Sequence, residues 1–271
     1  MTCSTFLLFI KSMSETLIGT SGYYYDDWKG LFYPDNMAKK DYLKYYSEHF
    51  HTLELNYTYY RLPDIKQSQS MIARTGPDMT FAVKAHREMT HKITENSISS
   101  ITPRFLDGIG PFIDNNCLGS ILLQFPQSFH YNDNNRIYLK RLIQYLLPAP
   151  LSVEFRNKNW LKESVYRNLS DLNTGFVCVD EPELPSLIPK IKIVTSDTGY
   201  IRFHGRNRDK WYGTDSRSRY DYLYSEQELR EWLPFIKDMM EKTKRLFIFF
   251  NNHAKSQAVT NAGMLINLLK Q

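Results

Sequence analysis

Short apolar runs that recur along the chain constrain its fold more than any other feature. Each run is six to eight residues long and rich in β-branched or aromatic residues, as expected of strands in a buried sheet. The eight runs are residues 16–22, 50–56, 79–86, 118–125, 151–156, 174–180, 200–205 and 245–252. A chain that forms eight strands within about 250 residues has few architectures open to it.

The segments between these runs favour helices. We expect helices over residues 36–47, 63–74, 98–113, 134–147, 160–172, 225–241 and 256–270. Regular alternation of strands and helices predicts an α/β protein built as a single (β/α)8 TIM-type barrel, with an open doubly wound sheet as the alternative. No strand is followed by GxGxxG or by a Walker loop, so the sequence contains no nucleotide-cofactor motif.

The 271 residues contain no linker or low-complexity segment that would divide the chain. We therefore expect residues 16–271 to form one domain and residues 1–15 to be an N-terminal extension. The apolar patch at residues 6–10 is too short for a secretory signal and no basic segment precedes it. We expect residues 1–12 to reflect an over-long start, with Met13 as the natural initiator.

Composition narrows the setting of the protein. Cys3, Cys117 and Cys178 are too widely spaced for a zinc knuckle or a disulfide framework, which favours a reducing, cytoplasmic location. No segment approaches the roughly 20 apolar residues of a membrane span, so no membrane partner is expected. The formal charge of +5 is compatible with an anionic ligand but does not require one.

Side chains alternate between the two faces of a strand. In residues 151–156, Leu151 and Val153 share an apolar face, and Glu154 and Arg156 share the opposite one. Similar alternation elsewhere predicts a ring of polar side chains at the carboxyl ends of the strands: Glu54, Asn56, Lys84, His86, Gln124, Glu154, Arg156, Arg202 and His204. Asp180 at the end of the sixth run, and Asn251 and Asn252 at the end of the eighth, are expected to join this ring. TIM barrels keep their active sites at this end, called the C-terminal mouth below.

The residue types at the mouth predict their roles. We expect Glu54, Glu154, His86 and His204 to be catalytic, because carboxylates and imidazoles carry general acid–base chemistry. Glu154, Asp180 and His204 are the candidate ligands of a divalent metal, the one cofactor that these residue types favour. The alternative is that Lys84, Arg156 and Arg202 pair with the carboxylates in place of a metal, in a network that only holds the barrel together.

Two aromatic-rich loops add further candidates. Residues 200–222 interleave basic and aromatic residues after the seventh run, where barrels often bind phosphate, and residues 22–34 form an aromatic loop after the first. Solvated or capping loops are the alternative for both. The expected substrate-binding residues are Asn56, Lys84, Gln124, Arg156, Arg202, Arg206, Trp28, Tyr33, Trp211, Tyr212, Asn251 and Asn252.

Seven sequence blocks carry a family resemblance. GTSGYYYDDWKGLFYP, YYSEHFHTLELNYTYYRLP, FAVKAHREMTH, LLQFPQSF, SVEFRNKNW, YIRFHGRN with WY, and FFNNH occur in that order over residues 17–270. They resemble the domain-of-unknown-function 72 (DUF72) family, also called YecE-like. The resemblance implies a TIM-type barrel and assigns no activity. This chain departs mildly from the family pattern at Tyr23, where Trp is usual, and at Tyr59, where Phe is usual.

Three functions follow from these features. The leading hypothesis is a hydrolase-type enzyme, such as a phosphodiester hydrolase, that acts on a phosphorylated small molecule or a nucleic acid. The second is a non-catalytic nucleic-acid-binding protein that uses the basic loop, with binding that weakens steeply with salt. The third is a carbohydrate-processing enzyme whose aromatic side chains stack on a sugar.

Overall fold

The computed structural model describes residues 14–212 and 216–271. Eight parallel strands close into a barrel in the order β1 to β8, and each pairs with its neighbours in sequence. The strands are β1 Glu15–Ser21, β2 Thr52–Leu55, β3 Thr80–Lys84, β4 Leu118–Gln124, β5 Leu151–Glu154, β6 Gly175–Asp180, β7 Thr198–Phe203 and β8 Arg245–Phe250. All eight lie where the apolar runs predict them, so the (β/α)8 barrel is confirmed.

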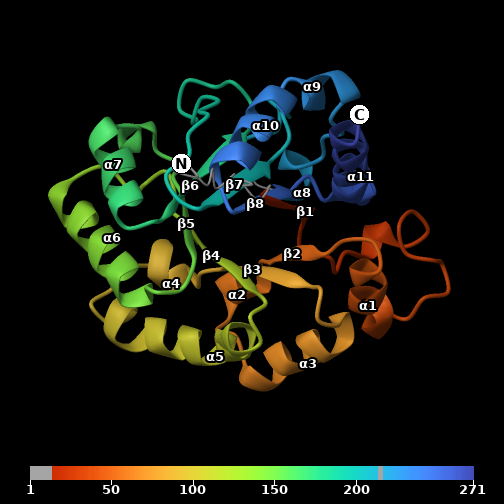
Figure 1. Ribbon diagram of the computed structural model, residues 1–271, viewed down its shortest axis with the longest axis horizontal. Coiled ribbons are helices and arrows are strands. Elements are labelled where there is room, and N and C mark those ends of the chain that lie inside the picture. Colours follow the sequence, from red (N-terminus) through yellow and green to blue (C-terminus); the bar gives the residue numbers. More distant parts are fainter. Residues whose placement is uncertain (1–13, 213–215) are drawn as a thin grey trace, which may run out of the picture.

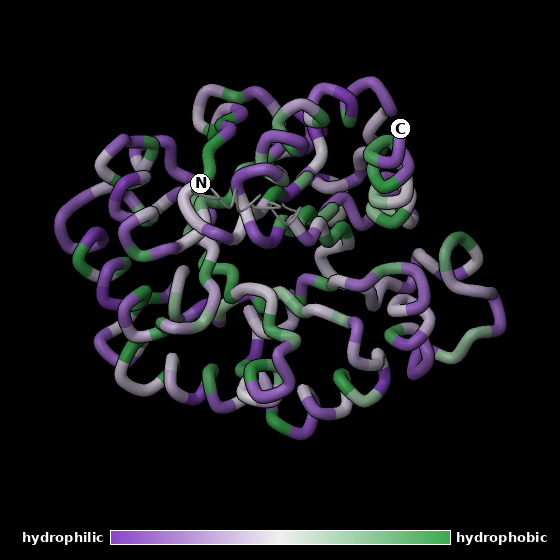
Figure 2. The backbone as a smooth tube through the Cα atoms, viewed as in Figure 1, coloured by the Kyte–Doolittle hydropathy of each residue, from purple (hydrophilic) through white to green (hydrophobic). Residues whose placement is uncertain are grey.

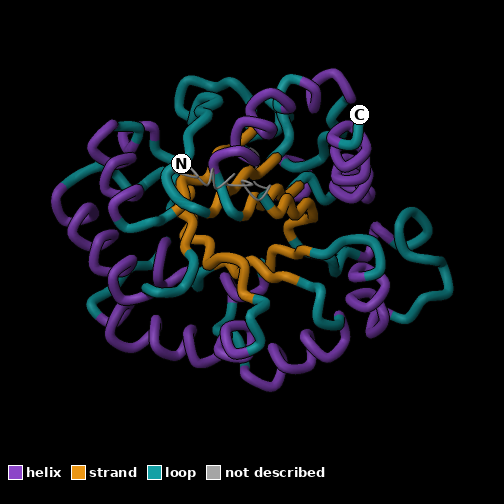
Figure 3. Tube along the Cα trace, in the orientation of Figure 1, coloured by secondary structure: helices purple, strands orange, loops and turns teal. Residues whose placement is uncertain are grey.

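Helices surround the strands as an outer layer (Figure 1, Figure 3). They are α1 Tyr42–Ser47, α2 Tyr57–Tyr60, α3 Ile65–Thr75, α4 Arg87–Thr90, α5 Thr102–Asp114, α6 Asp133–Leu146, α7 Glu163–Asp171, α8 Ser216–Arg219, α9 Glu226–Arg230, α10 Leu233–Lys242 and α11 Gln257–Leu269. No helix of this described part is long and apolar enough to cross a membrane. Residues 1–13 of the expected extension, including Met13, lie outside the described residues, and β1 already begins at Glu15.

Local sequence explains where several helices begin and end. A capping box forms at the start of α9, where Ser225 and Glu228 exchange side-chain-to-backbone hydrogen bonds. The expected helix over 225–241 divides into α9 and α10, and Pro234 lies in the first turn of α10. Gly108 lets α5 approach the segment just before α3 closely, because a Cβ at this position would lie 2.3 Å from the backbone oxygen of Pro63.

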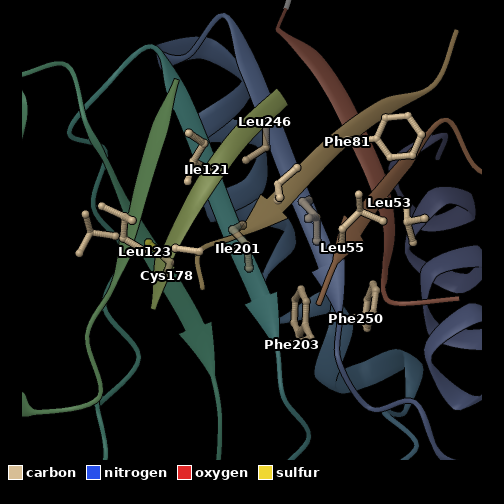
Figure 4. Close-up of a cluster of buried hydrophobic side chains, with 14 of the residues drawn as sticks. Leu53, Leu55, Phe81, Ile121, Leu123, Cys178, Ile201, Phe203, Leu246 and Phe250 are labelled. Atoms are coloured by element: carbon tan, nitrogen blue, oxygen red, sulfur yellow. The ribbon is translucent and has the colours of Figure 1, made fainter. Parts of the chain in front are cut away.

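The main core lies between the barrel and the helices. Most outward side chains of the strands are apolar, and Figure 4 shows several of them: Leu53, Leu55, Phe81, Ile121, Leu123, Cys178, Ile201, Phe203, Leu246 and Phe250. A smaller apolar cluster, which includes Ala82, Leu122, Val177, Val179 and Phe249, fills the barrel interior. Hydropathy follows this layering, with hydrophobic stretches along the strands and hydrophilic residues on the outer turns (Figure 2). The polar side chains lie above the inner cluster, toward the C-terminal mouth.

Candidate functional site

A buried arginine organises the mouth. Arg202 on β7 is only 2% exposed and donates from Nη2 to Glu54 Oε1 at 2.7 Å and from Nη1 to Glu154 Oε2 at 2.6 Å. Tyr200 donates its hydroxyl to the other oxygen of Glu54 at 2.7 Å. Since β2, β5 and β7 are not adjacent in the barrel, Arg202 ties three separate strands together across the interior.

Arg156 extends the ion pairs of Arg202, Glu54 and Glu154 toward solvent. Its Nε lies 2.6 Å from Glu154 Oε1, an ion pair in which the N–H does not point well at the oxygen. Its Nη1 donates to Glu181 Oε2 at 2.7 Å, and Glu181 Oε1 accepts from the backbone N–H of Ile188 at 3.1 Å. We call Glu54, Arg202, Glu154, Arg156 and Glu181 the Glu–Arg network. The ion-pair alternative to a metal site is therefore present in the structure.

The network fixes the protonation states of two predicted catalytic residues. Burial opposes ionisation of Glu154, but the Arg156 and Arg202 guanidinium groups outweigh it and hold its pKa well below the usual range. Burial and the Arg156 guanidinium lower the pKa of His204 to about 3. Arg156 Nη2 lies 2.9 Å from His204 Nε2, as expected for a neutral imidazole that accepts a hydrogen bond. Glu154 is thus ionised and His204 neutral near pH 7.

Lys84 differs from the other inward charges. It lies at the end of β3, is partly exposed, and has neither an ion pair nor a hydrogen bond to its ammonium group within residues 14–212 and 216–271. Its Nζ lies over the Tyr59 ring, 4.6 Å from the centroid. Burial and the positive charge of Arg202 lower the pKa of Lys84 to about 7, against the opposing effect of Glu154. Lys84 is therefore close to half neutral at physiological pH.

Strand alternation missed two residues in the segment that follows Lys84. His91 follows α4, packs edge-to-face on Tyr59 with centroids 4.8 Å apart, and has a pKa lowered to about 4 by burial and by the charges of Lys84 and Arg156. Arg87 is the first residue of α4, and no described side chain pairs with its guanidinium. Both lie in FAVKAHREMTH beyond the strand, where strand alternation has no predictive power.

Several polar atoms at the mouth have unused hydrogen-bonding capacity. Asn56 precedes α2 without capping it, and its Oδ1 is buried without a partner among the described residues. Ser21 Oγ, on the inward face at the end of β1, is also buried and unpartnered there. Gln124 is 8% exposed and makes a long bond of 3.5 Å from Nε2 to the Phe125 carbonyl. These groups are available to a ligand that reaches the mouth.

Asp180 was expected at the mouth, but the structure places it on the outer face of β6. Val177 and Val179 point into the barrel, so Asp180 must point toward the helices, and the inward position falls to Glu181. Asp180 accepts from Arg206 at 2.8 Å through each oxygen and from Trp232 Nε1 at 2.7 Å.

Two other expected mouth residues share this outer location. Arg206 pairs with Asp180 and also with Glu228 at 3.2 Å and Glu231 at 3.0 Å, so it is not positioned to clamp a ligand at the mouth. Asn252 donates to the Tyr222 carbonyl and to Asn261 Oδ1, each at 2.8 Å. Phe249 points inward, which turns Asn252 outward and leaves Asn251 beside His204.

A substitution tests the structural role of Asp180. We expect Asp180→Asn to lower the free energy of unfolding by about 1–3 kcal/mol, because an amide cannot accept all the hydrogen bonds that the carboxylate receives and leaves a buried donor unsatisfied. Urea unfolding at pH 7 measures the effect. Asp133→Asn, at an exposed ion pair with Arg136, is the control and should change little. Equal stability of the two variants would contradict this role.

The remaining expected site residues lie apart from the network. His86 is buried and accepts from the Glu88 backbone N–H at 3.4 Å as the N-cap of α4. Trp28 and Tyr33 are packed inside the aromatic loop rather than displayed at the mouth, and Trp28 Nε1 donates to the His253 carbonyl at 2.6 Å. Trp211 is also buried. Tyr212 is 62% exposed and its hydroxyl contacts that of Ser186.

The expected metal ligands do not converge. Asp180 lies on the opposite face of its strand from Glu154 and His204, and both oxygens of Glu154 are occupied by Arg156 and Arg202. Across the part of the chain that is described, no three His, Cys, Asp or Glu side chains come together as a ligand set. The residues at the mouth do not fit the metal site that we expected.

Comparison with known proteins agrees with the barrel. A family model, "Protein of unknown function DUF72", matches residues 17–271. UPF0759 protein YunF of Bacillus subtilis (strain 168) is 29% identical over 252 residues, which cover 88% of this chain and 89% of that protein. A DUF72 family protein from Thermotoga maritima MSB8 has a TM-score of 0.87 and 37% identity, covering 95% of this chain and 100% of that chain.

A second solved structure shows the fold alone. It is a DUF72 family protein from Enterococcus faecalis V583, with a TM-score of 0.82 and 23% identity, covering 94% of this chain and 96% of that chain. The match of the family model over residues 17–271 reaches from the third residue of β1 through α11 to the final residue. The chain therefore belongs to the DUF72 family.

Proposed function

We propose that this protein is an enzyme with its active site at the C-terminal mouth, and that it acts on a small phosphorylated compound. One observation carries the proposal: Lys84 Nζ lies over the Tyr59 ring, the charge of Arg87 acts on the hydroxyl of the same tyrosine, and neither cation has a carboxylate partner within the described residues. Burial raises the pKa of Tyr59, and the nearby Arg87 guanidinium opposes the rise. Unpaired cations near a partly exposed aromatic ring suit a phosphate group.

The other arginines are less suited to this task. Arg202 and Arg156 each contact two carboxylates of the Glu–Arg network, and Arg206 contacts three on the outer face. A phosphate would have to displace a buried carboxylate from any of them, which leaves that carboxylate unpaired at a large cost. Anion binding at the mouth is therefore best supported at Lys84 and Arg87.

Hydrolysis is the reaction class in this proposal, and it needs a group that removes a proton from water. Glu154 is a poor base because its oxygens are occupied and its pKa is held well below the usual range by Arg156 and Arg202, despite its burial. Lys84 fits the role better, because its pKa of about 7, set by burial and Arg202, leaves much of the amine neutral. We assign the proton transfer to Lys84.

Calorimetric binding tests the proposal. The probes are inorganic phosphate, glycerol 3-phosphate and ribose 5-phosphate, at low salt and pH 7. We expect Arg87→Gln to weaken binding of the phosphorylated probes about tenfold or more, the loss of one charge-assisted hydrogen bond of about 1.5–3 kcal/mol. Arg61→Gln is the matched control, since Arg61 is exposed near the same mouth, lies over Tyr57 and already bonds Gln67.

Two outcomes would overturn this assignment. Equal affinity of Arg87→Gln and the unchanged protein would remove Arg87 from the phosphate site. Binding of single-stranded oligonucleotides alone, with a steep dependence on salt and a loss in Arg208→Gln/Lys210→Gln, would favour the nucleic-acid-binding alternative. That alternative draws its support from the exposure of Arg208 and Lys210 after β7.

A further inference from the structure

Lys84 has the placement of a nucleophile. It extends from a rigid strand, reaches partial solvent exposure at the mouth, and makes no ion pair within the described chain. The face of the Tyr59 ring lies against its Nζ, so the amine is held between an aromatic surface and the open end of the barrel. A lysine with this exposure and without a counter-ion can present its lone pair to an electrophilic carbon.

We propose that Lys84 forms an imine with an aldehyde or ketone that also carries a phosphate group. This inference rests on the proposed function, because it takes the mouth as the active site and Arg87 as the phosphate contact. It goes further in naming the reacting group of the substrate, a carbonyl carbon, and the covalent bond that forms. Lys84 then acts as a nucleophile as well as a base.

The neighbours of Lys84 suit a carbonyl oxygen. Strand register aligns Leu55 with Val83, which sets Asn56 beside Lys84, and Gln124 lies on β4, the strand on the other side of β3. Asn56 has an unpartnered buried amide oxygen, and Gln124 is weakly bonded. One amide on each side of the amine can therefore exchange hydrogen bonds with the oxygen of a bound carbonyl group and with the hydroxyl that it becomes.

The step is balanced without any further reactant. The neutral amine of Lys84 attacks the carbonyl carbon, a C–N bond forms, and the carbonyl oxygen becomes a hydroxyl. The C–O bond then breaks, and the oxygen leaves as water with the two hydrogens that the amine nitrogen held. The products are the imine and one water molecule. The pKa of about 7 caused by burial and Arg202 supports this step, since an ordinary lysine with a pKa of about 10.4 has a neutral fraction of only about 0.0004 at pH 7.

Reductive trapping tests the inference. The protein is incubated at pH 7 with cyanoborohydride and one of four probes: glycolaldehyde phosphate, dihydroxyacetone phosphate, glycolaldehyde or pyruvate. Hydride reduces any C=N bond to a stable secondary amine, and peptide mass spectrometry locates the modified lysine. We expect Lys84 to be labelled by the phosphorylated carbonyl compounds roughly tenfold or more above exposed lysines such as Lys66 and Lys237, given its larger neutral fraction. Arg87→Gln should reduce this labelling, while Arg61→Gln should not.

The outcomes separate the inference from the proposed function. Phosphorylated probes that bind in an Arg87-dependent way without labelling Lys84 would overturn the imine and leave the proposed function standing. Equal labelling by glycolaldehyde and its phosphate would overturn the phosphate requirement. Neither binding nor labelling would overturn both. The labelling readout is made on the unchanged protein, so it does not depend on whether a Lys84 variant folds.

Discussion

Replacing Arg202 by methionine is expected to lower the free energy of unfolding by about 3–5 kcal/mol at pH 7, the cost of removing one partner of a buried ion pair. Arg202 is 2% exposed, and both carboxylates that it contacts, those of Glu54 and Glu154, are fully buried. Methionine fills much of the space but leaves these charges without the guanidinium. Urea unfolding followed by circular dichroism measures the loss.

Arg245→Met is the matched control for this prediction. Arg245 also lies on a strand and pairs with a carboxylate, that of Glu15 at 2.8 Å, but its side chain is 41% exposed. Its loss should therefore cost only about 0–1 kcal/mol. If Arg202→Met is no less stable than Arg245→Met, the Glu–Arg network does not hold the barrel together.

The loss of unfolding free energy caused by Arg202→Met should be smaller at acidic pH. In the unchanged protein the pKa of Glu154 is depressed, mainly by Arg156 and Arg202 acting against burial, so its ionisation contributes stability above the unfolded pKa of about 4.3. That contribution is lost as the pH falls through the lower folded value. In the variant the loss of Arg202 raises this folded pKa, so the variant loses less stability on acidification. The gap between the two proteins should thus be smaller at pH 4 than at pH 7.

Strand alternation predicted much of the site because a strand has only two faces. Glu54, Lys84, Glu154 and Arg202 each lie on a strand whose opposite face is clearly apolar, and the structure brings them to the interior of one barrel. Asp180 was expected at the mouth only because it ends the sixth run, and that expectation was wrong. The sequence there reads Asp180-Glu181, two acids of opposite parity, and only the inward position of Val179 decides between them.

The sequence alone could not predict which charged side chains pair with one another in the site. Glu54 and Arg202 lie 148 residues apart, and their contact depends on how far each side chain extends across the closed barrel. Strand alternation could not identify Arg87 and His91, because the helix α4 begins shortly after β3 and its side chains do not repeat every two residues. Trp28 and Tyr33 were misplaced for another reason, since the aromatic loop after β1 is large enough to bury its own rings.

The amine of Lys84 is expected to titrate near pH 7, roughly three units below an ordinary lysine. Burial disfavours the ammonium form, and the Arg202 charge disfavours it further, while Glu154 and Glu54 oppose both effects without cancelling them. Competitive acetylation across pH 5 to 11, quantified for each lysine by peptide mass spectrometry, measures the midpoint, because only the neutral amine reacts. The combined signal of the exposed lysines should rise with a midpoint near the ordinary value of about 10.

Arg156→Gln tests the direction in which the charge of Arg156 shifts the pKa of Lys84. Arg156 lowers the pKa of Lys84 through repulsion between like charges, so its removal should move the Lys84 midpoint upward. Arg136→Gln is the control, since Arg136 is exposed on α6 and should leave the midpoint unchanged. A midpoint near 10 in the unchanged protein would mean that Lys84 is an ordinary ammonium ion at neutral pH. The proton transfer and the imine chemistry assigned to Lys84 would then lose their physical basis. Phosphate binding by Lys84 and Arg87 would not be affected, because it depends on their positive charges.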